Sequence, residues 1–165
     1  MTYANTARWV ESKGKDRYRR GMYTWFQRTS PHPLMTTFDA ADGIVCTVKR
    51  DRSNTPLGAL MLLNDPAFVE CAQALAKRIL AEAPKTTSER VDWLMRTCVG
   101  RLSSPAERMA ILGLHGEMLV LAKAKPEETA KLTNGISAAD ARTEAAAWVG
   151  IARLMLNLDE FMVRE

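Results

Sequence analysis

Apolar side chains recur every three or four residues along most of the chain after residue 56, which is the spacing of one face of an α-helix. The pattern predicts helices over 57–63, 67–83, 90–99, 105–123, 127–132 and from Ser137 onward. In the last of these, Trp148, Ala152 and Met155 fall on one stripe, so this helix is expected to face the core.

Helix starts are marked by capping residues. Residues 86–89, 104–107 and 137–140 each place a hydroxyl side chain three positions before an acidic one, as in a capping box. Asp65 precedes Pro66, and a cap followed by proline is typical of a helix N-terminus. Because these signals agree with the apolar pattern, we predict an all-α, bundle-like fold.

The first 55 residues follow a different pattern. Only residues 17–28 have apolar side chains spaced for a helix, and residues 45–48 form a short β-like patch. Residues 1–52 contain 10 Lys/Arg against 5 Asp/Glu, whereas the remainder contains 13 against 14. We therefore predict one domain or domain fragment over 1–165, with an irregular basic arm (1–55) and a helical body (56–165).

Composition and charge narrow the class of protein. Of the 165 residues, 47% are hydrophobic and 25% charged, which is typical of a globular chain. We find neither a targeting signal nor a run of about 18 apolar residues, so no transmembrane segment is expected. The basic arm could meet phosphate or an acidic partner, but it lacks any nucleic-acid motif, so no nucleic-acid partner is expected. Its charge is interpreted as normally neutralised by neighbouring parts of a larger protein.

Few residues could carry metal or acid–base chemistry. The three cysteines are far apart in sequence and are expected to be buried small hydrophobes. The alternative is one disulfide and one free thiol. His115 has no acidic residue at ligand spacing, and no metal site is predicted. His32 lies between two prolines, where we expect it to be exposed and able to contact a ligand or a neighbouring domain.

The segment from Arg50 to Pro66 is the main candidate ligand site. Arg50 and Arg52 flank a carboxylate and precede a helix N-terminus, where an anion could bind. Asn54, Asn64 and Asp65 lie at the two ends of the short helix that follows. The alternative is purely structural: the side chains cap the helices, and an Arg–Asp pair fixes the loop.

The C-terminal polar residues are assigned structural roles. Asn157 is flanked by leucines in the last predicted helix, so its amide should bond a neighbouring backbone group or an arginine. Asn157 and Glu160 share one helical face, and Asp159 lies on another.

Three sequence blocks resemble a known family. They are DRYRRGMYT with RTSP (16–24, 28–31), the FDA, CTV, NTPL and NDP segments between 38 and 66, and LNLDEF with RE (156–161, 164–165). A weaker fourth block covers 100–101 and 104–107. Together they resemble the C-terminal part of the planctomycete-type domain of unknown function 1553, which accompanies planctomycete cytochrome C modules.

The resemblance implies a place in a larger protein. It suggests an accessory or structural module of a periplasmic or cell-envelope protein, with the upstream domains as partners. Any haem would then belong to an upstream module, and no cofactor is expected in this chain. The alternative it implies is a component of a redox or polysaccharide-degrading enzyme with a site near Arg50–Pro66. The family has no established catalytic residues to transfer.

Overall fold

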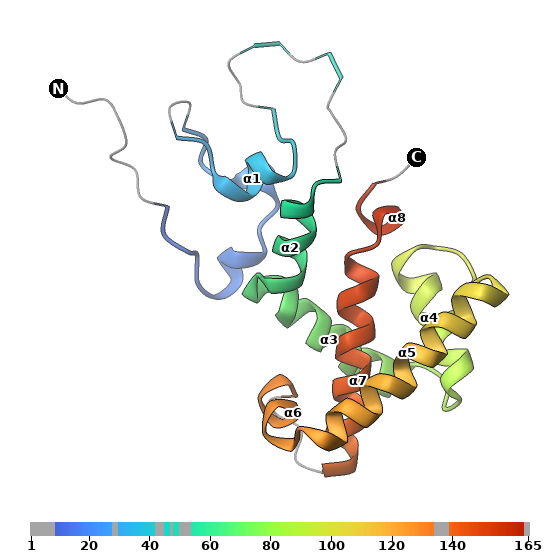
Figure 1. Ribbon diagram of the computed structural model, residues 1–165. Coiled ribbons are helices and arrows are strands. Elements are labelled where there is room, and N and C mark those ends of the chain that lie inside the picture. The colour runs from blue at the N-terminus through green and yellow to red at the C-terminus, as the bar shows by residue number, and fades with distance from the viewer. Residues whose placement is uncertain are drawn as a thin grey trace. The chain divides into compact units, whose positions relative to one another are not determined.

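The computed structural model describes residues 9–27, 30–41, 45–46, 48–49, 54–133 and 139–163, without the side chains of 139–140. The chain divides into two units, Met1–Met61 and Leu62–Glu165. The division lies a few residues after position 55, where the predicted arm ends. All regular elements in the described ranges are helices (Figure 1), which confirms the all-α prediction.

The second unit is built around one long helix. Its elements are α3 (Pro66–Glu82), α4 (Thr87–Cys98), α5 (Pro105–Ala124), α6 (Pro126–Leu132), α7 (Ala139–Leu156) and α8 (Asp159–Met162). Helix α7 packs along both α3 and α5, as Figure 1 shows, and α6 packs against α5 and α7. The second unit therefore has α7 at its centre.

The core lies where α7 meets α3, α4 and α5. Its largest fully buried side chains are Trp148, Ile79, Leu94, Met95, Ile151, Met155, Val91 and Val149. The stripe predicted on α7 is fully buried, since Trp148, Ala152 and Met155 all have 0% exposure. This agreement follows from helical periodicity, because residues three, four and seven apart share one face.

The helix caps explain where several helices begin and end. The Asp65 carboxylate accepts from the Ala67 N–H at 2.8 Å, and Thr86 caps α4. Ser104 and Glu107 form a complete capping box at the start of α5. Gly100 follows the end of α4 with φ +82°, a conformation that favours glycine, and its N–H donates to two carbonyls of the last turn.

The first unit contains shorter elements. They are the 3-10 helices η1 (Gly14–Tyr18) and η2 (Gly21–Tyr23), the five-residue α1 (Pro33–Thr37) and the start of α2 (Pro56–Asn64). The prediction of one helix over 17–28 is wrong, because two short 3-10 turns occupy that stretch. Helix α1 is not among the predicted elements; it begins at Pro33, whose fixed φ and missing N–H suit the first helical position.

Two further local predictions need correction. Of the β-like patch 45–48, Val45, Cys46 and Val48 are not in a strand, and Thr47 lies outside the described residues. All three cysteines are free, and Cys46 and Cys71 are exposed rather than buried. Cys71 precedes Ala72 on α3, and it is Ala72 that lies on the helix face turned to the core.

Candidate functional site

The predicted site around residues 50–66 is only partly described. Arg50 and Arg52 lie outside the described residues, so their proposed anion-binding role stays a prediction. Asn54 and Asn64 are both exposed, before and at the end of α2. Asp65 is half-buried, with one carboxylate oxygen engaged in the cap of α3. Capping accounts for the placement of Asp65 without a ligand.

His32 is packed rather than freely exposed. Its ring lies 4.8 Å from the ring of Trp9, edge to face, and Trp9 in turn contacts Trp25 at 5.8 Å. The His32 backbone occupies the N-cap position of α1, and its side chain is half-buried. The expectation of an exposed imidazole is therefore wrong, because an aromatic neighbour from an earlier segment covers it.

The C-terminal polar residues have separate surroundings. Helix α7 ends at Leu156, so Asn157 lies just beyond the helix and not within it as predicted. Its carboxamide makes no hydrogen bond to the described residues, and it is only half-buried, which leaves it accessible to water. Glu160 pairs with Arg101 at 2.7 Å, and Asp159 begins α8.

Arg101 links two segments of the second unit. Its guanidinium bonds both Glu107, in the capping box of α5, and Glu160, on α8. These bonds hold the pKa of each carboxyl below its ordinary value. Because all three groups are exposed to solvent, water screens this cluster strongly. The role of this cluster is structural, because Arg101 ties the segment before α5 to both α5 and α8.

A pocket that was not predicted lies in the second unit. It has a volume of about 640 Å³ and is lined by α5, α6 and α7, with Leu63 at the end of α2. Its wall is mainly apolar and includes Met118 and Leu121 from α5 and Leu154 from α7. Met118 and Leu121 belong to the apolar pattern that predicts the helix over 105–123, and apolar periodicity does not distinguish a core face from a pocket wall.

Polar groups lie among the apolar residues of this pocket. Lys125 is paired with Glu128 at 3.2 Å, and the Thr129 hydroxyl donates to the Ala122 carbonyl at 2.9 Å. Arg153 donates through Nη2 to the Leu63 carbonyl and forms no ion pair with a carboxylate among the described residues. Among the described residues, the pocket therefore combines an apolar wall with one cation, Arg153, that has no ion-pair partner.

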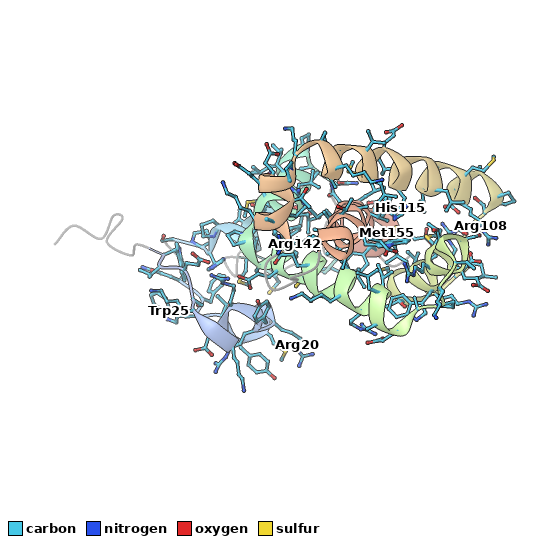
Figure 2. All side chains as sticks on the ribbon, turned by 90° about the horizontal axis from the view of Figure 1, so that it is seen from below. Arg20, Trp25, Arg108, His115, Arg142 and Met155 are labelled. Atoms are coloured by element: carbon cyan, nitrogen blue, oxygen red, sulfur yellow. The ribbon has the colours of Figure 1, made fainter. Side chains whose placement is uncertain are left out.

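A second feature is the exposed aromatic segment, defined as residues 18–26. Trp25 is 65% exposed, Tyr23 59% and Tyr18 55%, and Met22 and Phe26 are also exposed. Figure 2 shows Trp25 and Arg20 on the segment that precedes α1. Arg20 lies 5.7 Å from the centre of the Tyr23 ring, in cation–π contact.

His115 lies in the core of the second unit. Its ring is 4.5 Å from that of Trp148, and its Nε2 is buried without a hydrogen-bond partner among the described residues. Burial lowers the pKa of His115 below its ordinary value, and the charge on Glu144 opposes this effect. In the described part of the chain, no three His, Cys, Asp or Glu side chains gather into a metal site.

Comparison with known proteins identifies the family. The model of the PSD1 family, described as a protein of unknown function (DUF1553), matches residues 1–115. The chain belongs to the DUF1553 family. This confirms the resemblance seen in the first blocks, whereas the block at 156–165 lies beyond the match. No curated protein and no solved structure matches the chain.

The DUF1553 match spans both units and ends within α5. It therefore contains the aromatic segment and the 50–66 segment, but it excludes α6 and α7, which supply much of the pocket. In the described residues, no helix is both long and apolar enough to cross a membrane.

Proposed function

We propose that this DUF1553 chain is an accessory, non-catalytic helical module of a larger bacterial cell-envelope protein. Its partners are the upstream domains of that protein, and the exposed aromatic segment is the surface that binds them. The observation that carries the proposal is the exposure of Tyr18, Tyr23 and Trp25 within one short segment.

Interface chemistry supports this assignment. Tyrosine, tryptophan, methionine and arginine are enriched at protein interfaces, and the aromatic segment contains all four types. Tryptophan and tyrosine also supply much of the binding energy where they fill a partner's pocket. Leaving such side chains in water has no benefit for the folding of the segment itself.

The proposal assigns no cofactor to this chain, and any haem belongs to an upstream module. The alternative is a redox or polysaccharide-degrading component with its site near Arg50–Pro66. No observation in the described residues favours this alternative over capping. Asp65 is engaged at the start of α3, and the Gly58 N–H donates to the Thr55 hydroxyl at 3.1 Å at the start of α2.

Hydrogen exchange tests the docking. The isolated chain should exchange rapidly at the amides of residues 18–26, and the same amides should be protected in the product of the complete gene. Replacing Tyr23 and Trp25 together by serine should abolish that protection. As a matched control, serine at Met109 and Val120, which are 71% and 70% exposed on α5, should leave it unchanged.

Two outcomes would contradict the proposal. One is equal exchange of residues 18–26 in the isolated chain and in the complete protein. The other is protection that survives the Tyr23/Trp25 double substitution, since the two rings would then contribute nothing to the interface.

A further inference from the structure

We propose that the pocket between α5, α6 and α7 binds an amphipathic carboxylate, such as a medium-chain fatty acid. Its apolar body would lie against the leucine-rich wall, and its carboxylate would pair with Arg153. This site belongs to the second unit and the aromatic segment to the first, and the inference is independent of the proposed docking role.

The dimensions of the pocket fit a small organic ligand. Its volume of about 640 Å³ falls within the roughly 300–1,000 Å³ typical of ligand pockets. The three helices supply the wall, with Leu114, Met118 and Leu121 from α5, Leu132 from α6, and Gly150 and Leu154 from α7. Leu121 and Leu154 are 49% and 39% exposed, so a bound acyl chain would remove apolar surface from water.

Gly150 contributes by having no side chain. A Cβ at this position would lie 3.1 Å from the Met118 sulfur, which is closer than ordinary contact. Any larger residue would therefore displace Met118 or occupy the pocket itself. The glycine thus keeps the α5 and α7 walls in their present arrangement.

The charges of the pocket lining favour an anionic ligand. Lys125 and Arg153 supply two positive charges to the lining and Glu128 one negative charge, which leaves a net charge of +1. Lys125 is already paired with Glu128, so the uncompensated charge is that of Arg153. The Arg153 Nε is shielded from solvent and has no hydrogen-bond partner among the described residues.

Arg153 is held in a suitable position. Its Nη2 donates to the Leu63 carbonyl, which leaves Nη1 to donate to a ligand. Asn157, four residues further along, also lines the pocket and can donate through its carboxamide. The carbonyl ends of α2 and α7 oppose a nearby anion by about half a charge each at most, but this effect falls off within the last turn, whereas the guanidinium can hydrogen-bond the carboxylate directly.

Calorimetric titration of the full 165-residue chain tests the site. Sodium dodecanoate should bind with one-to-one stoichiometry, 1-dodecanol about tenfold more weakly, and acetate not at all, because a charge-assisted hydrogen bond contributes about one decade of affinity. Arg153→Leu should remove the preference for dodecanoate over dodecanol, and Arg153→Lys should restore part of it.

Adjacent substitutions on α5 provide a second, independent comparison. Leu121→Glu places a carboxylate in the pocket wall and should weaken dodecanoate binding at least tenfold. Val120→Glu is the matched control, since Val120 is 70% exposed and does not line the pocket. Circular dichroism should show the same helix content in both variants.

Several results would overturn the inference. They are equal affinity for dodecanoate and dodecanol, equal effects of Leu121→Glu and Val120→Glu, or no binding of dodecanoate below its micellar concentration. The inference would also be overturned if the chain sediments with phosphatidylglycerol vesicles but does not bind free dodecanoate, because the ligand would then be a membrane surface.

Discussion

The two units of this chain use their large side chains in opposite ways. In the second unit, Trp148, Ile79 and Leu94 are fully buried around α7. In the first unit, η1, η2 and α1 contain no buried residue, and Trp25 and Tyr23 are largely exposed. Both units are well supplied with apolar residues, so composition alone does not explain the difference.

The difference lies in element length and periodicity. Helices α3, α5 and α7 have 17, 20 and 18 residues, long enough to present an apolar stripe over several turns. The elements η1, η2 and α1 have three to five residues and can present only one turn. The second unit therefore buries one apolar stripe of each long helix in a shared core, whereas η1, η2 and α1 bury no residue.

Replacing one tryptophan in each unit gives the largest expected contrast. Trp148→Ala should lower the free energy of unfolding by about 3–5 kcal/mol, because it leaves a cavity in the core. Trp25→Ala should change it by less than about 0.5 kcal/mol, since the side chain is mostly in water. Urea unfolding measures both. Equal losses would mean that the first unit is as tightly packed as the second.

A buried arginine tests whether polar groups also stabilise the second unit. The Arg90 side chain is 11% exposed, pairs with Glu144 and donates to the Pro84 carbonyl at 2.9 Å. Arg90→Met should reduce the free energy of unfolding by about 1–3 kcal/mol, because two acceptors lose a charged donor.

Arg78→Met is the control for that experiment. The Arg78 side chain is 53% exposed and pairs with Glu82 one turn along the same helix. Solvent screens such pairs, so urea unfolding should show little change. A loss as large as that of Arg90→Met would show that exposure does not separate the two arginines.

A helix cap should have a smaller effect. Asp65→Ala removes the acceptor for the Ala67 N–H and should cost about 1 kcal/mol, whereas Asp65→Asn, which can still cap, should be nearly neutral. Thermal unfolding measures both. A full loss with asparagine would mean that the negative charge of Asp65, and not its capping oxygen alone, stabilises the start of α3.

Sequence periodicity predicted the second unit well because its long helices repeat a single spacing many times. Trp148, Ala152 and Met155 could be assigned to the core for this reason, and Thr86 and Ser104 could be assigned as caps. The same reasoning failed for residues 17–28, where one turn of apolar spacing does not distinguish an α-helix from two 3-10 turns.

The pocket could not be predicted from the sequence. Met118 and Leu121 lie on an apolar stripe like that of the core, and only the packing of α5 against α6 and α7 leaves space beside them. The prediction of an exposed His32 failed for a similar reason, because its contact with Trp9 joins segments more than twenty residues apart. Periodicity predicts which face is apolar but not what lies opposite that face.

The smallest expected effect concerns His115, whose buried ring contacts Trp148. Burial lowers its pKa below the ordinary 6.5, so the folded state binds fewer protons than the unfolded state. Stability should therefore fall as pH drops below 6.5, and the full loss is reached below the folded pKa.

Urea unfolding between pH 7.5 and 5 should show this decline in the wild type and a weaker one in His115→Phe. The Glu82, Glu107 and Glu160 carboxyls, whose pKa values are also lowered, contribute only below about 4.5. Glu144→Gln should steepen the decline, because the Glu144 charge favours protonated His115. An identical pH dependence in the wild type and His115→Phe would show that the core does not exclude the charged imidazole.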